Sequence, residues 1–585
     1  MNGDNVKGAV VNLLPMPRTI DLHDELVAAR PAARRVDPSL PPQGYELRIG
    51  RDGVDLAGGD EAGLFYGEAT LAQLARSHDG RLPVGTVQDH PDIAVRGVML
   101  DISRDKVPTM DSLRAVIDRL AGLKVNQVQL YSEHTFAYRN HAEVHGAASP
   151  LDAGEILELD AFCRARHVEL VPNQNCLGHM NRWLAHDRYR PLAIEPDGFV
   201  DPYGIARRPM TIEPGNPASL ALVRELLAEL LPLFSSRRVH VGLDEAWELP
   251  ALRIDDFLSW VTTLRALPEL EGREMLMWGD MISGRRDQID RLPAGVTVCE
   301  WGYDDWYPFD ERCAVLAEAG VPFWVAPGTS SWLSILGRFT NARLTCSRAA
   351  AAALAHGGSG FLNTDWGDNG HLQQWVISEP ALAFGAAVSW CHATNEALDV
   401  AAALSAHVFE DPTGKLAEAV LALGDAHRLV TPQFPNMSTL VMNLYYPQFP
   451  VGRGLTDGFA AAEVDVVQVC LDEARATVAG AAPSRADGDW LVDEVVYSVD
   501  LVSLLLRDAQ ARLRGDGTLA GIPDDERAVL GADLDQLMER ARVLWLRRNR
   551  PGGLDDSLAW LRNVRGGYAS GRADPTWGGI TVRDG

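Results

Sequence analysis

Short apolar runs alternate with longer amphipathic runs over the middle of the chain, starting near Val95. The short runs are rich in β-branched residues and nearly unbroken, which is typical of strands buried on both faces in a parallel sheet. Eight of them occur, at residues 95–102, 125–131, 168–173, 237–243, 275–278, 296–301, 322–327 and 360–364. Each gap has room for a helix or loop that crosses back to the next strand. The pattern therefore predicts an α/β fold with one closed (β/α)8 TIM barrel.

The barrel segment, predicted to span residues 93–398, is flanked by regions with other patterns. Before it, strand-like runs at 45–49 and 54–56 and a helical run at 62–76 predict a small α/β domain over residues 1–92. After it, the strand pattern fades and valines recur at helical spacing. Residues 399–585 are therefore predicted to form a mainly helical C-terminal region. Those valines are Val492, Val495, Val496, Val499 and Val502.

The composition narrows the class of protein. Of the 585 residues, 46% are hydrophobic and 23% charged, as in globular proteins, and no run of about 18 apolar residues predicts a membrane span. The net charge of −26 disfavours nucleic acid and anionic membrane surfaces as partners, because clustered Lys and Arg bind both. The start of the chain lacks a secretory signal, and the seven cysteines form no C-x-x-C pair. We therefore expect a cytoplasmic chain with reduced thiols.

Polar residues gather directly after the predicted strands, where a parallel barrel carries its working loops. They are Asp101, Glu133 with His134, residues 173–179, Asp244 with Glu245, Trp278 with Asp280, Glu300 with Trp301, and residues 365–368. Carboxylates interleaved with tryptophans suit a sugar, because aromatic faces cover the apolar faces of the ring and carboxylates accept hydroxyl protons. The chain has no phosphate-binding glycine motif of the P-loop kind. A carbohydrate is therefore the favoured ligand.

The sharpest segment is residues 240–245, which end in Asp244 and Glu245. Consecutive strand residues point to opposite faces, so both carboxylates can face one pocket only if the backbone turns just past the strand. Two close carboxylates raise the proton affinity of one of them, which keeps a general acid protonated near neutral pH. A solvated acidic pair in a loop is the alternative interpretation of this segment alone.

Here the chain resembles glycoside hydrolase family 20, the β-N-acetylhexosaminidases. The pattern His240-x-Gly242-x-Asp244-Glu245 after the fourth strand looks like that family's signature, and residues 96–104 resemble its first-strand motif. The likeness covers residues 8–395. It implies a retaining exo-glycosidase in which the 2-acetamido group of the substrate is the nucleophile, removing terminal β-linked GlcNAc or GalNAc. By this resemblance, Asp244 orients the acetamido group and Glu245 is the general acid and base.

The resemblance also implies a set of substrate-binding residues. By it, Arg96 holds ring hydroxyls, although a salt bridge at the barrel bottom is the alternative, and His179 lies near the catalytic acid. Asp368 stands where the family usually has a longer Glu, and Glu133 is the candidate supporting acid. The expected aromatic walls are Trp278, Trp301 and Trp366. Residues 327–332 depart from the family, because they lack the tyrosine that usually binds the acetamido oxygen.

Three alternatives stay open at this point. His141 and His145 are four residues apart, a spacing that binds a metal from one helix face, but no third ligand follows them. The other two are a non-catalytic amino-sugar-binding protein and a barrel glycosidase for a sugar without the acetamido group. We expect no cofactor and no metal, and a small oligosaccharide or glycoside as the partner. A homodimer is left open.

Overall fold

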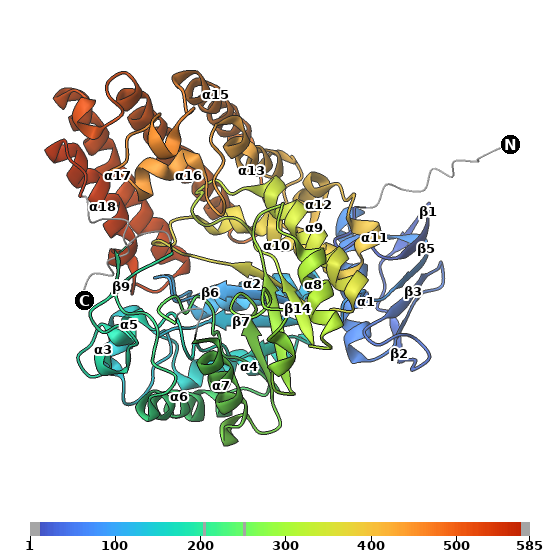
Figure 1. Cartoon of the computed structure of the whole chain (residues 1–585). Helices are drawn as coiled ribbons and strands as arrows, with labels where there is room; N and C mark the ends of the chain where they lie inside the picture. Colours follow the sequence, from blue (N-terminus) through green and yellow to red (C-terminus); the bar gives the residue numbers. More distant parts are fainter. Residues whose placement is uncertain (1–11, 203–205, 250–252, 575–585) are drawn as a thin grey trace.

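The computed structural model describes residues 12–202, 206–249 and 253–574, which form three regions in chain order (Figure 1). The predicted N-terminal and C-terminal regions also include residues 1–11 and 575–585, which lie outside the described residues. Among the described residues, no helix is long and apolar enough to cross a bilayer.

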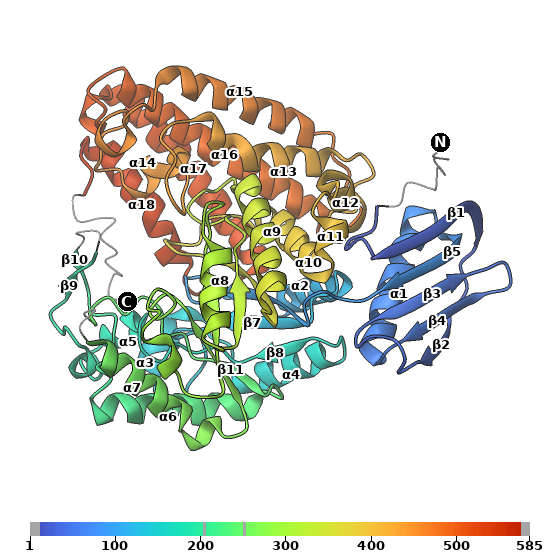
Figure 2. The same cartoon turned by 45° about the vertical axis from the view of Figure 1, so that its right-hand side comes forward.

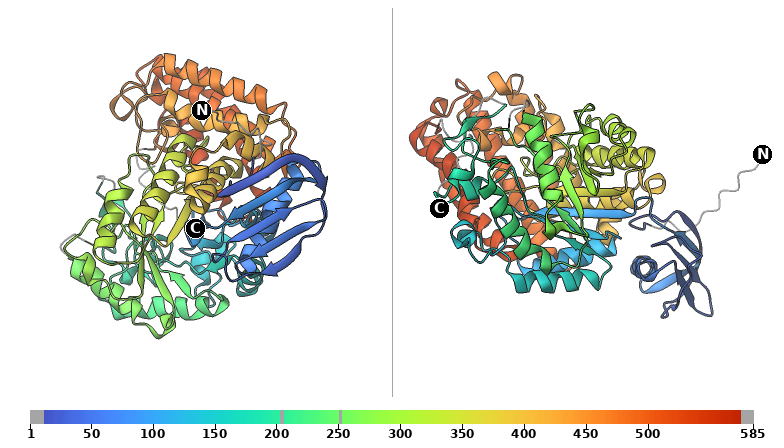
Figure 3. Two further views of the ribbon diagram at one scale, coloured as in Figure 1. Left: turned by 90° about the vertical axis from the view of Figure 1, so that its right-hand side faces the viewer. Right: turned by 60° about the horizontal axis from the view of Figure 1, so that its bottom comes forward.

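The N-terminal region is a five-stranded sheet with helix α1 packed on one face (Figure 3). Its strand order is β1-β5-β3-β4-β2. The elements are β1 (Thr19–Ala28), β2 (Ala33–Val36), β3 (Tyr45–Ile49), β4 (Val54–Gly58), α1 (Glu61–Ser77) and β5 (Arg81–Asp89). Asp60 caps α1 by accepting a hydrogen bond from the backbone N–H of Gly63. The backbone of α1 can approach the sheet because Gly67 lies against Leu56 and Tyr45, where a Cβ atom would be 2.3 Å from a methyl group of Leu56.

The middle region is a TIM barrel, as predicted, and each of the eight predicted strands is present. The strands are β6 (Val95–Asp101), β7 (Gln127–Tyr131), β8 (Glu169–Val171), β11 (Arg238–His240), β12 (Glu274–Trp278), β13 (Val296–Trp301), β14 (Phe323–Ala326) and β15 (Gly360–Asp365). They pair in parallel in this order, and β15 pairs with β6. Between β8 and β11 the ring is completed by a bridge of Asn173 with His240, whose N–H donates to Pro172 O at 2.9 Å.

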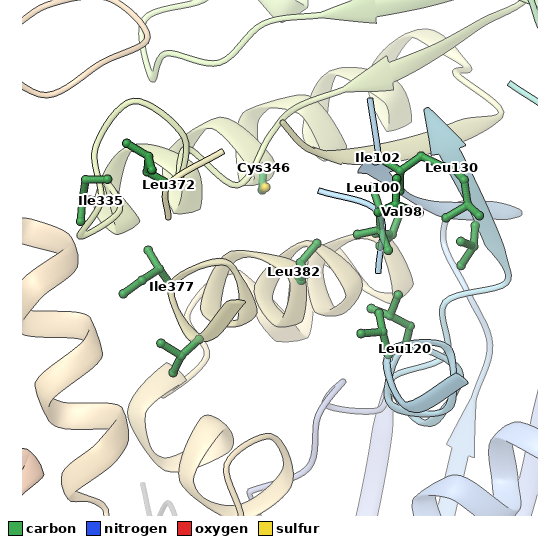
Figure 4. Close-up of a cluster of buried hydrophobic side chains, with 14 of the residues drawn as sticks. Val98, Leu100, Ile102, Leu120, Leu130, Ile335, Cys346, Leu372, Ile377 and Leu382 are labelled. Carbon is green, nitrogen blue, oxygen red and sulfur yellow. The ribbon is translucent and has the colours of Figure 1, made fainter. Parts of the chain in front are cut away.

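Helices cover the outside of the barrel because one stripe of each is apolar. In α2 the buried residues Leu113, Ile117 and Leu120 recur at helical spacing. Leu120 lies in a cluster with Val98 of β6 and Leu382 of α10 (Figure 4). The helices that follow the strands are α2 (Met110–Gly122), α3 (Ala142–His145), α4 (Ala153–Arg164), α5 (Asn181–Leu184), α6 (Pro217–Leu230), α7 (Ile254–Arg265), α8 (Phe309–Glu318), α9 (Phe339–His356) and α10 (Trp375–Trp390). A small hairpin, β9 (Phe199–Val200) with β10 (Ala206–Arg207), lies in the crossover after β8.

The C-terminal region is a layer of helices on one side of the barrel, and it runs from α11 and α12 beside the N-terminal region to α17 and α18 at the far end (Figures 1 and 2). It contains α11 (His392–Asn395), α12 (Val400–His407), α13 (Lys415–Asp425), α14 (Met442–Tyr445), α15 (Ala461–Val478), α16 (Gly488–Leu513), α17 (Asp524–Arg548) and α18 (Leu554–Ser570). The valines singled out in the sequence lie on α16. Glu494 of α16 accepts a hydrogen bond from the backbone N–H of Val376 at 3.0 Å, which satisfies an end group of barrel helix α10.

The turn between α17 and α18 fixes this layer against the barrel. Gly552 and Gly553 pass so close to barrel loops that a Cβ atom would lie 2.3 Å from the carbonyl carbon of Ala148 and 2.0 Å from the carbonyl oxygen of Asp105. Gly553 also has φ +76°, in the left-handed region that glycine adopts without strain. The C-terminal region therefore rests directly on the loop that follows β6.

Candidate active site

Asp244 and Glu245 follow β11, and the backbone turns between them and the strand. Gly242, Leu243 and Glu245 have φ values of +72°, +76° and +47°. A side chain at Gly242 would meet Oδ1 of Asn175 at 1.8 Å, so only glycine fits. This left-handed turn replaces the alternation of a strand, and both carboxylates line the same cavity.

His179 joins the two carboxylates. Its Nε2 lies 3.2 Å from Oδ2 of Asp244 and 3.5 Å from Oε2 of Glu245, while its Nδ1 lies 3.7 Å from Oε1 of Glu133 and 3.3 Å from Nη2 of Arg104. Burial opposes the charge of an imidazole, but the Asp244 carboxylate outweighs it and raises the pKa of His179 to about 9. The sequence-predicted residues Glu133, His179, Asp244 and Glu245 thus form one chain of ionisable groups.

The pKa values of Asp244 and Glu245 are shifted in opposite directions. Burial raises the pKa of Glu245, and the negative charge of Asp244 raises it further against the opposing effect of His179. Burial also acts on Asp244, but His179 and Arg104 together hold its pKa below the usual range. A protonated Glu245 beside an ionised Asp244 is the division expected of a general acid and an electrostatic partner.

Arg104 is the arginine that the structure places in the cavity. Its backbone N–H donates to Oδ1 of Asp101 at 3.0 Å, and its guanidinium lies 3.3 Å from Oδ2 of Asp101 and 3.4 Å from Oε1 of Glu133. The guanidinium also lies over the rings of Tyr131 and Trp366, at 4.7 and 5.1 Å from their centroids. Arg104 is therefore held in one orientation from two sides.

The expectation that Arg96 binds the substrate is wrong. Arg96 is the second residue of β6, at the end of the barrel opposite the cavity, and is 1% exposed. It donates to the carbonyl oxygens of Ile93 and Lys124 and to Oε1 of Gln43, and its guanidinium lies 4.8 Å from the ring of Trp390. No carboxylate pairs with it among the described residues, so the salt-bridge alternative is not seen either. Arg96 instead joins the N-terminal region to the bottom of the barrel.

The aromatic walls come from the carboxyl ends of the strands. The aromatic residues that line the cavity at or after the ends of strands β12 to β15 are Trp278, Trp301, Tyr303, Trp332 and Trp366. Trp301 and Tyr303 stack at 5.1 Å, and Nε1 of Trp366 donates to the Tyr303 hydroxyl at 2.8 Å. The three predicted tryptophans are thus together in one cavity. Sequence reasoning did not select Tyr303 or Trp332, whose only local signal was a position shortly after a strand.

Two further carboxylates stand near the pair. Asp368, predicted from the sequence, lines the cavity, and burial raises its pKa to about 7. Asp280 accepts from the backbone N–H of Glu245 at 2.9 Å and from Nε1 of Trp301 at 3.3 Å. Burial and the nearby Asp244 raise the pKa of Asp280 to about 7. Asp280 therefore ties the backbone of Glu245 to an aromatic wall.

The divergent stretch 327–332 turns its hydroxyl groups away from the cavity. Thr329 and Ser331 both donate to Oδ1 of Asp365, at 2.6 and 2.8 Å. Within this stretch only Trp332 lines the cavity, and its Nε1 donates to Oδ1 of Asn436 at 3.0 Å. The seventh strand therefore offers an aromatic face rather than a hydroxyl group.

His141 and His145, the two histidines considered as metal ligands, each contact a different polar group of the protein. Nδ1 of His141 lies 2.6 Å from the Tyr189 hydroxyl, and Nε2 of His145 lies 2.9 Å from the carbonyl oxygen of Tyr138. Within the described ranges, no group of three or more His, Cys, Asp or Glu side chains is arranged to hold a metal ion. This pair therefore does not form a metal centre in the described structure.

The C-terminal region completes the cavity, whose volume is about 410 Å³. The residues it contributes are Asn436, Tyr446, Asp556, Ala559 and Trp560. Asp556 lies 2.8 Å from Nη2 of Arg182, a barrel residue, and Trp560 packs so close to Gly370 that a Cβ atom there would lie 2.4 Å from its ring. The cavity is thus a pocket closed by two regions of the chain rather than a groove on the barrel alone.

A parallel barrel with two close carboxylates of opposite pKa shift and aromatic walls at its carboxyl face is the arrangement of the barrel glycoside hydrolases. Sequence comparison narrows this class. Residues 6–90 match the family model described as glycosyl hydrolase family 20, domain 2, and residues 94–345 match that of the family 20 catalytic domain. The chain belongs to glycosyl hydrolase family 20.

Individual relatives agree with this family. The chain is 27% identical over 267 residues to a β-hexosaminidase of Akkermansia muciniphila, covering 41% of this chain and 54% of the relative. It is 26% identical over 322 residues to a β-N-acetylhexosaminidase of Cellulomonas fimi, covering 52% and 62%. The chain thus spans little more than half the length of these relatives. The structure of a Vibrio harveyi exo-β-N-acetylglucosaminidase in complex with N-acetylglucosamine shares the fold, with a TM-score of 0.55, 16% identity, and coverage of 70% and 78%.

Proposed function

We propose that this protein is a retaining exo-β-N-acetylhexosaminidase that removes terminal β-linked GlcNAc or GalNAc from small oligosaccharides or glycosides by substrate-assisted catalysis. The observation that carries the proposal is the pair at the end of β11. Burial raises the pKa of Glu245, His179 and Arg104 hold that of Asp244 below its usual range, and both carboxylates lie within 3.5 Å of His179 in one pocket.

In the first step, the carbonyl oxygen of the 2-acetamido group attacks the anomeric carbon, and the bond to the leaving oxygen breaks. Glu245 transfers its proton to that oxygen, so the leaving group departs as an alcohol. The cyclic oxazolinium intermediate carries the positive charge. In the second step, water attacks the anomeric carbon on the opposite face, Glu245 takes its proton, and the acetamido group is released. An intramolecular nucleophile is effective because it can have an effective molarity of roughly 10⁵ M or more.

Asp244 supports the charge that develops on the acetamido group. Its Oδ1 is buried and accepts no hydrogen bond from the described side chains and backbone. An amide N–H of the substrate would supply that bond, and the ionised carboxylate would balance the positive charge of the intermediate. This role requires an ionised group, which fits the lowered pKa of Asp244.

The acetamido oxygen needs a donor that does not come from the seventh strand. The Tyr303 hydroxyl accepts from Trp366, so its own proton can be donated into the cavity. Nε1 of Trp278 is buried and donates to no atom of the described residues. We assign the acetamido oxygen to Tyr303, with Trp278 beside it.

A panel of aryl β-glycosides that differ at C2 and C4 tests the proposal. The wild type should cleave the GlcNAc or GalNAc compound and leave the 2-hydroxy glucoside intact. Asp244→Asn should lose most of this activity, while Asp255→Asn, an exposed aspartate on α7, should retain it. Cleavage of the glucoside at a similar rate would indicate a glycosidase that does not use the acetamido group. Binding without cleavage of every compound would indicate an amino-sugar-binding protein.

A thiazoline mimic of the cyclised intermediate distinguishes a nucleophile supplied by the substrate from one supplied by the enzyme. It should bind far more tightly than free GlcNAc, because it resembles the state that the pocket stabilises. Equal affinity for both would contradict a nucleophile supplied by the substrate.

A further inference from the structure

The cavity has a second group of aromatic side chains that the proposed mechanism does not use. In the proposed mechanism one sugar ring and its acetamido group are bound beside Asp244 and Glu245 by the first group, which is Trp278, Trp301, Tyr303, Trp332 and Trp366. Trp247 and Tyr446 line another part of the same cavity, together with Arg207. Trp247 follows the catalytic pair, Arg207 ends β10, and Tyr446 comes directly after α14 of the C-terminal region.

Arg207 connects these side chains. Its guanidinium lies 5.4 Å from the centroid of the Trp247 ring, and its Nε lies 2.6 Å from Oδ2 of the buried Asp201. Its charge also acts on the pKa of Tyr446 and on that of Glu245, so it stands near both. In Figure 2 the β9–β10 hairpin lies on the same side of the molecule as α14 and α18.

This group lies on the side from which the leaving group departs. The backbone N–H of Trp247 donates to the carbonyl oxygen of Glu245 at 2.7 Å. Trp247 therefore lies in the same tight turn as the proposed proton donor, two residues further along the chain. The Glu245 side chain is 31% exposed and that of Asp244 is 10% exposed, so the donor faces the mouth of the pocket. A leaving group protonated by Glu245 moves toward the mouth, where these side chains stand.

We propose that Arg207, Trp247 and Tyr446 form a subsite for the sugar ring that leaves, so that the preferred substrate is an oligosaccharide rather than a simple glycoside. Aromatic faces cover the apolar faces of a sugar ring, and a guanidinium donates to its hydroxyl groups. The cavity of about 410 Å³ falls in the range of pockets that hold drug-sized ligands, which are as large as a disaccharide. The inference rests on the proposed function.

The family comparison does not supply this subsite. The match to the family 20 catalytic domain ends at residue 345, about one hundred residues before Tyr446. Tyr446 reaches the cavity only because the C-terminal layer packs against the loops after β6 and β15. Selection of the second ring is therefore a property that the C-terminal region adds to the barrel.

Two substrates with the same transferred sugar test the proposal. N-acetyl-β-glucosaminyl fluoride has no second ring, and N,N′-diacetylchitobiose has one. The ratio of kcat/KM for the disaccharide to kcat/KM for the fluoride should fall about tenfold in Tyr446→Ala, which corresponds to about 1.4 kcal/mol of binding to the second ring. Tyr446→Phe keeps the ring and should restore most of the ratio. Leu455→Ala is the matched control, because Leu455 lies in the same segment between α14 and α15, is 50% exposed and does not line the cavity.

The outcomes separate the two proposals. If the wild type cleaves both substrates and Tyr446→Ala changes the two kcat/KM values by the same factor, the subsite is refuted while the proposed function stands. A ratio that falls equally in Leu455→Ala would also refute it, because the effect would then come from the fold of this segment. If the wild type cleaves neither substrate, the proposed function fails, and this inference fails with it.

Discussion

The charge of His179 makes a specific prediction about stability. Its folded-state pKa of about 9 lies above the ordinary value of 6.5, because the ionised Asp244 stands 3.2 Å from its Nε2. A raised pKa means that the folded chain binds the proton more tightly than the unfolded chain. The stabilisation is therefore complete below pH 6.5 and is lost as the pH rises toward 9.

The size of this stabilisation follows from the pKa shift of His179. Each pKa unit corresponds to 1.36 kcal/mol, so a shift of roughly 2.5 units amounts to about 3 kcal/mol of unfolding free energy. Other groups titrate nearby, and their effects must be removed. The pKa values of Asp280 and Asp368 are raised to about 7, so their contributions change mainly below pH 7. Lys106 has a pKa lowered to about 8, so its destabilising effect is complete below pH 8 and is relieved as the pH rises above 8.

A matched variant isolates the histidine. His179→Gln removes the titrating group and keeps a polar side chain of similar length. Urea denaturation of both proteins between pH 6 and 9.5 gives two curves, and their difference should shrink by about 3 kcal/mol from pH 6.5 to 9. His23→Gln, a change of an exposed residue in β1, should give a curve parallel to that of the wild type.

The reasoning is refuted by a difference that stays constant across this range. That result would mean that His179 is neutral in the folded protein. In that case its Nδ1 would accept from Arg104, and the low pKa of Asp244 would depend on Arg104 alone.

Three further predictions concern activity. Arg104→Gln should lower kcat/KM by about tenfold to a hundredfold, because charged hydrogen bonds are lost. Arg96→Gln should instead lower the melting temperature and leave kcat/KM of the folded enzyme near that of the wild type. The opposite pattern would indicate that Arg96, and not Arg104, binds the substrate. Tyr303→Phe should lower kcat on 2-acetamido substrates by about tenfold, as expected for one lost hydrogen bond, and an unchanged rate would remove its hydroxyl from the mechanism. Asp280→Asn removes a negative charge beside Glu245, so the alkaline limb of the pH–rate profile should move to lower pH; an unmoved limb in kcat/KM would contradict this coupling.

Most of the fold could be predicted from the sequence, because the signals are local. Strand period, β-branched composition and the spacing of the crossovers act within about ten residues of each position. The position of Asp244 and Glu245 in the cavity could be predicted for the same reason, since two carboxylates directly after a buried strand must lie at the carboxyl face of a barrel. A resemblance in a few short motifs then assigned their roles.

The two arginines of the first motif show where local reasoning failed. Arg96 and Arg104 belong to the same motif, and the resemblance assigned the substrate to Arg96. The bounds of β6 decide otherwise, because Arg96 is the second residue of the strand and Arg104 follows its end. Asp101 was selected from the sequence because it is a polar residue at the end of a predicted strand. The same criterion would have selected Arg104 as well.

The closed shape of the pocket was decided only by the tertiary structure. Tyr446 and Trp560 carry no motif, and they reach the cavity because contacts between distant segments hold the C-terminal layer in place. One of these contacts joins the Ser557 hydroxyl to the carbonyl oxygen of Gly370, 187 residues apart. Such contacts depend on the packing of whole helices rather than on neighbouring residues. The sequence by itself therefore determined the barrel and the place of Asp244 and Glu245 in its cavity, and the packing of the C-terminal helices decided what else lines the pocket.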